Sequence, residues 1–406
     1  MAVPDPQRRS PRSSRLSALS NRSLRVVAMG GGTGLSTLLK GLKRFVTRAS
    51  ALGKPDHPEI SELCAVVTVS DDGGSSGRLR KELNMLPPGD IRNCIVALSE
   101  DEALLSRLFQ HRFVKGSGLE GHSFGNLFLA ALTAVTSDFS EAVRLSSEIL
   151  LTRGHIYPAT TSHVELEALM EDGTRVRGET RITASSGRIQ QLFLDPADVK
   201  PLPQTLEAMA RADLITLGPG SLFTSLIPNL LVPGIAQAMV NSAAVKVYVG
   251  NLMTQANESL GLTAADHIRA LNRHAGVKRI FDFALINRAA APPALKAKYA
   301  LEGANQIVAD LEAVEELGVI PVLGDYLDEK DMVARHLTDR IATDLMDLVT
   351  QAPGGTRPTR SMGNLGNPAR YRPLAVYWIE CRKPITINLV PRKSRSPSWP
   401  RAKGRG

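Results

Sequence analysis

Cysteine is scarce in this chain, which has three in 406 residues: Cys64, Cys94 and Cys381. They lie too far apart to form the closely spaced thiols of a zinc site, and so few argue against a disulfide framework. We therefore expect a reducing compartment.

No apolar run approaches the roughly 20 residues of a membrane-spanning helix, and the first residues lack the apolar core of a secretion signal. The sequence predicts a cytoplasmic protein without a membrane span, although residues 1–24 also match an organellar transit peptide in composition.

Charge is unevenly distributed along the chain. Of the net charge of +9, residues 1–25 carry +5 and residues 351–406 carry +11, which leaves −7 for residues 26–350. Both basic ends are rich in Ser, Pro or Gly, so we expect disordered tails over 1–23 and 351–406 around an α/β domain over 24–350. Basic tails attract nucleic acid without sequence selectivity, but the acidic domain argues against a nucleic-acid partner.

Short apolar runs alternate with longer amphipathic segments, as in a parallel sheet with helices on both faces. The pattern predicts strands at 25–29, 63–69, 213–217, 246–249, 280–286 and 319–323, and helices at 35–45, 91–98, 138–150, 206–212, 264–274 and 341–349. Around Asp172-Gly173, alternating apolar and polar residues indicate a hairpin. We predict a Rossmann-like α/β fold with an antiparallel β-hairpin insertion over 155–195.

Glycines gather where the predicted strands end. The first strand runs into Gly30, Gly31, Gly32, Thr33 and Gly34. Such a loop lets backbone N–H groups and a helix N-terminus surround a phosphate. It lacks the Gly-Lys-Ser/Thr of a Walker A loop, and Leu35 stands where a dinucleotide fingerprint has its third glycine. We favour phosphate binding over a tight turn without a ligand.

A second polar loop follows the second strand, with Ser70, Asp71, Asp72, Gly73, Gly74, Ser75, Gly77 and Arg78. Asp71 and Asp72 are candidates for holding a hydroxyl or Mg²⁺, and Arg78 for pairing with an anion. Ordinary loop chemistry is the alternative. Residues 73–77 also match the G-x-S-x-G elbow of α/β-hydrolases, but Ser75 is displaced from the strand tip that this motif requires.

Further candidate ligand-binding residues follow in three groups. They are Asp90, Arg92 and Asn93, then His122, Ser123 and Asn126, and finally Gly218, Gly220, Ser221, Asn251, Thr254 and Gln255. Asp90 stands where a helix N-cap is expected, and a cation such as Arg92 in a first helical turn is unfavourable unless an anion lies nearby. His122 is expected to form hydrogen bonds rather than act as an acid or base, because no carboxylate partner can be assigned to it.

Together, residues 30–34, 70–77, 88–92, 125–126 and 218–221 resemble the YvcK/CofD-like family in order and separation, over about residues 24–350. One branch of that family comprises gluconeogenesis factors, which bind UDP-sugars and support cell shape and wall synthesis under gluconeogenic growth. The other comprises 2-phospho-lactate transferases of deazaflavin cofactor synthesis. Residues 251–255, Asp266-His267 and Arg335-His336 are similar to the first branch.

The resemblance implies a regulatory protein without catalytic residues, whose glycine loops hold the diphosphate of a UDP-sugar, and we expect a homo-oligomer. Leu262 departs from the family, whose members often have an aromatic residue there that is suited to stacking on a base, so the nucleotide stays open. The alternative is a transferase in which Asp71 or Asp72 holds Mg²⁺ while a phospholactyl-type group leaves a nucleotide carrier.

Overall fold

Seven parallel strands form the main sheet of the structure, a computed structural model that describes residues 23–47, 58–100, 102–330 and 332–351. The predicted tails lie outside these residues except for Ser23 and Gln351. Across the sheet the strands run β10 (Ile320–Gly324), β9 (Phe283–Asn287), β8 (Val245–Val249), β7 (Leu214–Leu217), β1 (Leu24–Gly30), β2 (Ile60–Val67) and β3 (His155–Pro158). The central strands are almost wholly buried, which explains why they are continuous apolar runs in the sequence.

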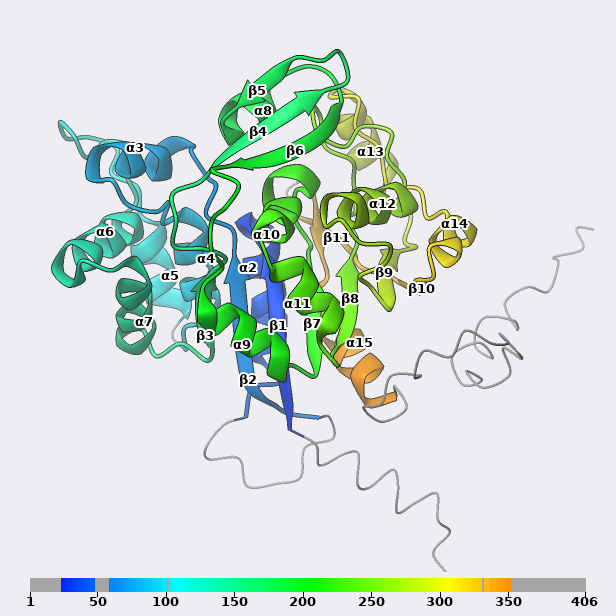
Figure 1. Ribbon diagram of the computed structural model, residues 1–406, viewed down its shortest axis with the longest axis horizontal. Helices are drawn as coiled ribbons and strands as arrows, with labels where there is room; N and C mark the ends of the chain where they lie inside the picture. The colour runs from blue at the N-terminus through cyan, green and yellow to red at the C-terminus, as the bar shows by residue number, and fades with distance from the viewer. Residues whose placement is uncertain (1–22, 48–57, 101, 331, 352–406) are drawn as a thin grey trace, which may run out of the picture. The chain divides into compact units, whose positions relative to one another are not determined.

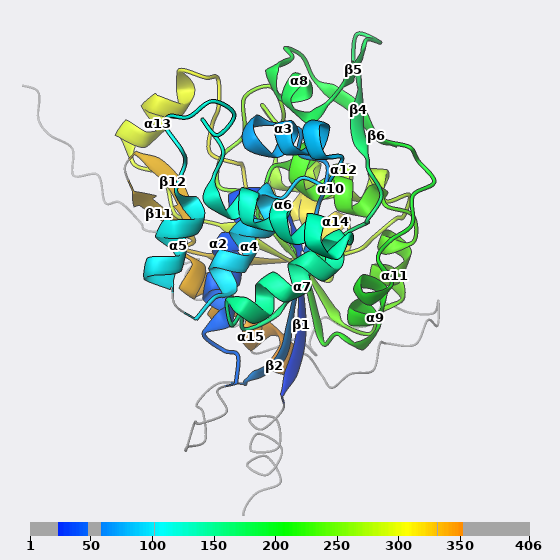
Figure 2. The ribbon, with the colours of Figure 1, turned by 90° about the vertical axis from the view of Figure 1, so that its left-hand side faces the viewer.

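Helices cover both faces of this sheet (Figures 1 and 2). On one face α2 (Gly32–Lys43) packs against α4 (Gly89–Leu98) and α15 (Thr338–Gln351), with α5 (Glu102–Gln110), α6 (Phe124–Thr136) and α7 (Phe139–Ile149) beside them. On the other face lie α9 (Pro203–Arg211) and α11 (Ile235–Asn241), with α10 (Ile227–Leu231) and α12 (Ala264–His274). The predicted Rossmann-like fold is confirmed, and α12 has the bounds that the sequence predicted.

The remaining elements are short. They are α3 (Gly74–Leu83), α8 (Glu179–Ala184), the π-helix η1 (Leu222–Leu226), α13 (Pro293–Ala300), α14 (Leu311–Glu316) and the hairpin β11 (Leu327–Lys330) and β12 (Val333–His336). None of these was assigned bounds from the sequence.

An antiparallel sheet of three strands stands above the carboxyl ends of the main sheet (Figure 1). It consists of β4 (Glu165–Met170) between β5 (Arg175–Arg177) and β6 (Ile189–Asp195). The hairpin at Asp172-Gly173 is therefore present, but the first residues of the expected insertion are not part of it. His155–Pro158 pairs in parallel with β2 as the edge strand of the main sheet. We call residues 165–195 the insertion from here on.

The chain changes direction between β1 and β7. It moves outward from β1 through β2 to β3, then returns to place β7 on the other side of β1 and continues through β8 and β9 to β10. In open α/β sheets, ligands bind outside the carboxyl ends of the strands at such a switch point. The loops after β1, β2, β7 and β8 are the polar and glycine-rich segments singled out in the sequence.

Among the described residues, no single helix is long and apolar enough to cross a membrane. Leu222–Leu231 and Ile235–Asn241 reach the required length and composition only as a pair, and the two halves meet at 78°.

Candidate functional site

The glycine loop after β1 packs against the loop after β7. A Cβ atom on Gly34 would lie 2.2 Å from the carbonyl oxygen of Pro219, so only glycine fits at this contact. Gly32 adopts a φ of +61°, in the left-handed region that favours glycine. Close packing of two loops therefore accounts for part of the first glycine motif, independently of any ligand.

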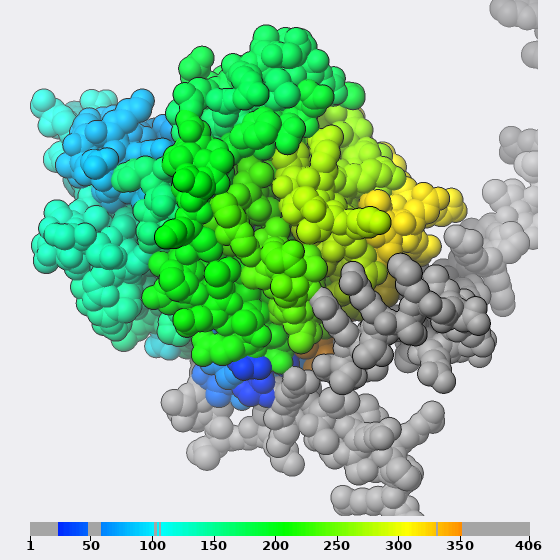
Figure 3. Space-filling view, viewed as in Figure 1, coloured from blue at the N-terminus to red at the C-terminus, as the bar shows by residue number. Residues whose placement is uncertain are grey.

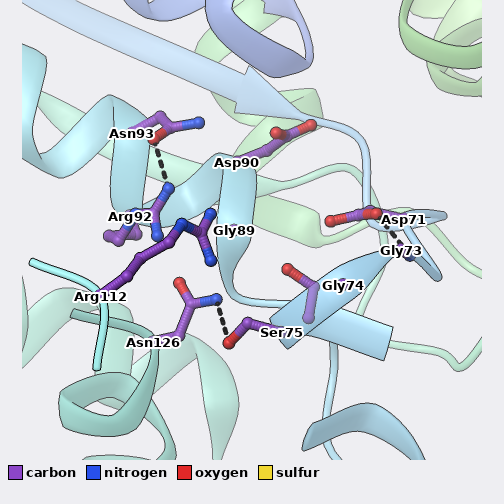
Figure 4. A pocket seen from close by; sticks show the side chains of 11 residues that line it. Asp71, Gly73, Gly74, Ser75, Gly89, Asp90, Arg92, Asn93, Arg112 and Asn126 are labelled. Atoms are coloured by element: carbon purple, nitrogen blue, oxygen red, sulfur yellow. Dashed lines mark hydrogen bonds between the residues drawn. The ribbon is translucent and has the colours of Figure 1, made fainter. Parts of the chain in front are cut away.

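A cavity of about 430 Å³ opens beside this contact, and we call it the first cavity (Figure 4). Its walls come from the loop after β2 and from α3, α4, α6 and the segment before α6. The lining residues are Asp71, Gly73, Gly74, Ser75, Ser76, Gly89, Asp90, Arg92, Asn93, Arg112 and Asn126. Eight of these eleven are among the candidates chosen from the sequence.

Two arginines supply the positive charge of the first cavity. Arg92 on α4 is 7% exposed, and its guanidinium donates from Nη1 to Ser123 Oγ at 2.5 Å and from Nη2 to Asn93 Oδ1 at 2.8 Å. Arg112 donates to the Gly121 carbonyl at 2.9 Å. Burial lowers the pKa of Arg92, and neighbouring Arg112 lowers it further. Neither arginine forms an ion pair with any carboxylate that the structure describes, so both remain available to an anion.

The buried guanidinium of Arg92 also has an unused donor. Its Nε atom is buried and has no hydrogen-bond partner in the described part of the chain. Figure 4 shows the Arg92 and Arg112 guanidinium groups together on one side of the cavity, with the Asp71 carboxylate on the opposite side. The sequence predicted that Arg92, a cation in the first turn of a helix, needs an anion nearby. In the structure Arg92 lines a cavity that is large enough to hold an anion.

Two helix N-termini border the same cavity. α3 begins at Gly74 and α4 at Gly89, and neither has a side-chain cap on its first N–H groups. Uncapped N–H groups and the helix dipole both favour an anion at that end. The first cavity thus combines two helix ends of positive polarity with two guanidinium groups that form no ion pair among the described residues.

Asp90 does not cap α4, contrary to the sequence prediction. The N-cap position is Pro88, and the Asp90 carboxylate instead accepts a 2.6 Å hydrogen bond from the N–H of Gly32 in the first glycine loop. Burial raises the pKa of Asp90, the Gly32 bond lowers it and the charge of nearby Asp71 raises it, with a net pKa of about 6. Asp90 therefore connects the glycine loop after β1 to the start of α4.

The two adjacent carboxylates after β2 line different cavities. Asp71 lines the first cavity, and its Oδ1 atom accepts from the N–H of Gly73 at 2.9 Å. Asp72 lines a second cavity, where its Oδ1 atom accepts from the N–H and the hydroxyl of Thr180 at 2.8 and 2.6 Å. Asp71 therefore shares the first cavity with Asp90 rather than with Asp72.

Ser75 is held by two buried side chains. Its Oγ atom lies 2.9 Å from His122 Nδ1 and accepts from Asn126 Nδ2 at 3.0 Å. Burial, and then the charge of Arg78, lowers the pKa of His122, so the imidazole is neutral at physiological pH. β2 ends at Val67 and Ser75 lies within α3, so the hydroxyl is not at a strand tip. The hydrolase elbow is absent, and His122 orients a hydroxyl at the cavity wall.

Asn126 presents an unused acceptor. Its Oδ1 atom is buried without a hydrogen-bond partner among the described residues, while its Nδ2 atom is used by Ser75. A ligand hydroxyl would satisfy such an acceptor.

The other candidates lie around the two cavities rather than in the first. Ser70 bonds with Thr68, Ser123 caps α6, and Arg78 donates to the Glu120 carbonyl. Gly77 lines the second cavity. Those that line neither cavity are Gly30, Gly31, Gly32, Thr33, Gly34, Ser70, Arg78, His122, Ser123, Gly218, Gly220, Ser221, Asn251, Thr254 and Gln255.

Two residues after β8 form hydrogen bonds with the loop after β7. Asn251 bonds to both the N–H and the carbonyl of Gly220, at 3.2 and 2.8 Å, and Gln255 donates to Ser221 Oγ at 2.9 Å. Within the described ranges, Thr254 bonds to Asn305 and not to the loop after β7. Asn251 and Gln255 therefore position the loop at the switch point.

Sequence reasoning did not select Ser76, Gly89 or Arg112 in the first cavity, nor Glu258, which contacts η1. Arg112 lies between α5 and α6, and no recognisable motif includes it. Glu258 accepts from the N–H groups of Phe223 and Thr224 at 2.8 and 2.9 Å, and so occupies the start of η1 where an anionic ligand would otherwise be expected. No local pattern marks Glu258, because its partners lie 34 and 35 residues earlier in the chain.

Comparison with known proteins identifies the family. A family model described as 2-phospho-L-lactate transferase CofD matches residues 26–327. The gluconeogenesis factor of Halalkalibacterium halodurans is 47% identical over 322 residues, which are 79% of this chain and 95% of the relative. That of Bacillus subtilis is 46% identical over 327 residues, or 80% and 98% of the two chains. A crystal structure of protein BH3568 from Bacillus halodurans, 47% identical, matches with a TM-score of 0.75 over 80% of this chain and 100% of that one. The chain therefore belongs to the CofD family and, within it, to the gluconeogenesis factors.

Proposed function

We propose that this protein binds a nucleotide sugar, of the UDP-sugar class, through the diphosphate in the first cavity, and that it acts as a regulatory protein without turning its ligand over. The observation that carries this proposal is the pairing of Arg92 and Arg112 beside two uncapped helix N-termini. Guanidinium groups match phosphate oxygens in geometry and charge. A diphosphate would neutralise both cations and use the open Nε donor of Arg92.

The surrounding polar groups fit the rest of such a ligand. Ser75 presents a hydroxyl whose orientation His122 and Asn126 fix, which suits contact with a phosphate oxygen. The Oδ1 atom of Asn126 accepts from a ligand hydroxyl, of which a nucleotide sugar has several. None of these contacts requires a bond to break, which supports binding without reaction.

The same proposal extends to the cell. As in the gluconeogenesis factors that the motifs resemble, ligand binding would report the supply of a wall precursor and support cell shape under gluconeogenic growth. Such a role places the protein in the cytoplasm, where nucleotide sugars are made. The predicted homo-oligomer remains part of this proposal.

A transferase is the second candidate function, because the family description names one. Mg²⁺ is usually held by one or two carboxylates together with substrate phosphates. Asp71 and Asp90 fit this requirement, since each has one oxygen outside its backbone hydrogen bond. No group of three or more His, Cys, Asp or Glu residues suited to a metal occurs in the described ranges. A bound Mg²⁺ would polarise a phosphoryl oxygen; Arg92 and Arg112 would then hold the remaining phosphate charge.

Isothermal titration calorimetry separates the two functions. The full chain is titrated with UDP-N-acetylglucosamine, UDP-glucose, GDP and NAD, each with and without Mg²⁺, and the ligands are recovered for mass spectrometry. Saturable UDP-sugar binding with unchanged ligand supports the regulatory protein. Preference for GDP together with Mg²⁺-dependent transfer would replace it with the transferase, and no binding of any of the four would refute both.

A further inference from the structure

The second cavity, of about 560 Å³, lies between α3 and the insertion. In Figures 1 and 2 these elements lie side by side, and in the space-filling view the surface of α3 borders that of the insertion (Figure 3). The lining residues are Asp72, Gly73, Gly74, Gly77, Arg80, Lys81, Glu165, Arg177, Gly178, Thr180 and Arg181. None of the side chains proposed above to contact the nucleotide sugar lines this cavity.

Cations outnumber carboxylates in its lining by four to two. One of the carboxylates, Asp72, is committed to Thr180. This concentration of positive charge stands in a stretch, residues 26–350, whose net charge is negative. A local excess of cations lining a concave surface attracts anions.

The four cations differ in what they contact. Arg177 forms ion pairs with Glu167 and Asp195, so it is largely neutralised. Lys81 and Arg181 are exposed, and neither forms an ion pair with a residue that the structure describes. Arg80 donates from Nη2 to the Val164 carbonyl.

Arg80 gives a second, independent reason to expect an anion in this cavity. Its Nη1 atom is buried and has no hydrogen-bond partner within the described ranges. A buried donor of a charged group without an acceptor is costly, and such groups are normally satisfied by protein, water or ligand. An anion in the second cavity would provide the acceptor.

Gly73 and Gly74 separate the two cavities and line both of them. Gly74 has a φ of +47°, and nothing lies within 4 Å of the position that a Cβ atom would take. No side chain therefore divides the first cavity from the second at this point. A ligand whose diphosphate lies in the first cavity can extend past Gly74 toward Arg80, Lys81 and Arg181.

From these observations we infer that the second cavity is a distinct anion subsite, which binds a carboxylate or phosphate group next to the nucleotide site through Arg80, Lys81 and Arg181. The anionic group belongs either to the sugar of the bound nucleotide or to a separate small molecule. The first case deepens the proposed function, on which it rests, by assigning a preference for acidic sugars. The second case is independent of it.

The test compares UDP-glucuronate with UDP-glucose, which differ by a carboxylate in place of a hydroxymethyl group. Calorimetry is performed on the full chain and on the double variant Lys81→Gln, Arg181→Gln. Both positions are exposed, so this variant is expected to fold. We expect the unsubstituted protein to bind UDP-glucuronate about tenfold more tightly, the gain of one charge-assisted contact. The variant should lose that preference and keep its affinity for UDP-glucose.

The matched control, Lys40→Gln with Lys296→Gln, removes two exposed charges that line neither cavity. It should keep the preference for UDP-glucuronate. A third titration uses inorganic phosphate on protein saturated with UDP-glucose. Phosphate binding that the double variant loses and the control keeps would assign the subsite to a separate anion.

The outcomes distinguish this inference from the proposed function. If neither the preference nor phosphate binding depends on Lys81 and Arg181, the subsite does not exist, even when UDP-glucose binds well. If no UDP-sugar binds to folded protein, the proposed function fails, and the phosphate titration on ligand-free protein still decides whether the second cavity binds an anion.

Discussion

Arg112 offers the most direct test of the phosphate contact at the scale of single residues. It is exposed, and in the described part of the chain its side chain bonds only to the Gly121 carbonyl, so Arg112→Gln should leave the fold intact. Loss of a charged hydrogen-bond donor to phosphate costs about 1.5–3 kcal/mol. We expect UDP-sugar binding at least about tenfold weaker by calorimetry, with an unchanged midpoint of thermal unfolding.

Lys115→Gln is the control for this substitution, because Lys115 is exposed in the same segment and lines neither cavity. Equal weakening in both variants would mean that only overall charge matters. Unchanged affinity in Arg112→Gln would remove Arg112 from the site.

Asp90 should give ligand binding a pH dependence. Its pKa of about 6 in the folded protein means that it gains a negative charge as pH rises from about 5 to 7. That charge faces the same cavity as Arg92 and disfavours an anionic ligand. The diphosphate of a UDP-sugar keeps its charge over this range, so affinity without Mg²⁺ should fall as pH rises. Asp90→Asn, which retains an acceptor for the N–H of Gly32, should flatten the profile in calorimetry at pH 5, 6 and 7.

The same ionisation affects stability with a defined sign. The pKa of Asp90 is raised on folding, so the folded state holds the proton more tightly than the unfolded state does. The free energy of unfolding of the wild type should therefore fall relative to that of Asp90→Asn as pH rises from about 4 to about 6. Above a pH of about 7 the difference between the two free energies should be constant. A difference that grows toward acid pH would show that the carboxylate is stabilised, not destabilised, in its charged form.

The residues predicted from sequence are those that stand in loops of recognisable composition. Glycines and hydroxyls after a strand mark a loop by their own chemistry, and Asp71, Gly74 and Ser75 were found in this way. Arg112 and Glu258 were not, because no such composition marks either position, and the partners of Glu258 lie 34 and 35 residues away. Asp90 was placed correctly at a helix start, but its actual partner, Gly32, is 58 residues away and had no local signature.

At the scale of elements, the sequence predicted the strands and helices whose burial leaves a clear apolar pattern or whose ends carry a capping signal. β1, β7 and β8 are apolar runs because both faces of the sheet are covered, and α12 carries its own start signal, a capping box at Thr263 and Asp266. β3 was missed because four residues at a sheet edge carry little pattern. α3 was missed because its sequence has two leucines among glycines, serines and charged residues, so no apolar face is apparent.

Asp72 connects two elements that are far apart in sequence. It accepts from the N–H and hydroxyl of Thr180, 108 residues away, and acts as the N-terminal cap of α8, whose own N-cap residue, Gly178, has no side chain. Asp72→Ala should cost about 1 kcal/mol, as loss of a helix cap does. We expect faster amide exchange in α8 and β4 by mass spectrometry, with β1 and β2 unchanged.

Asp172→Ala is the matched control. Asp172 makes the same pair of bonds, to the N–H and hydroxyl of Thr174, but within the hairpin of the insertion. Its removal should affect exchange only in that turn. If the two variants change exchange in the same peptides, Asp72 does not hold the insertion to the loop after β2.

At the scale of the whole molecule, the strand order explains why distant motifs meet. β1 is flanked by β2 and β7, so loops from both halves of the chain reach the same edge of the sheet. The alternation of strands and helices predicted this edge, because parallel strands end on one side. The same alternation did not predict two cavities, because the boundary between them depends on where the insertion contacts the loop after β2. That contact is made by Asp72 and Thr180, which no periodic pattern marks.

Ligand binding should stabilise the folded molecule as a unit. The first cavity is walled by the loop after β2 and by the starts of α3, α4 and α6, so a diphosphate contacts elements that must come apart on unfolding. Ligand at 100 times its Kd should add about 2.7 kcal/mol to the free energy of unfolding, because only the folded state binds it. Urea unfolding followed by circular dichroism, with and without UDP-N-acetylglucosamine, measures this gain.

Arg112→Gln should need about ten times more ligand for the same gain in the free energy of unfolding. A gain that is identical in wild type and Arg112→Gln at every ligand concentration would place the ligand outside the first cavity.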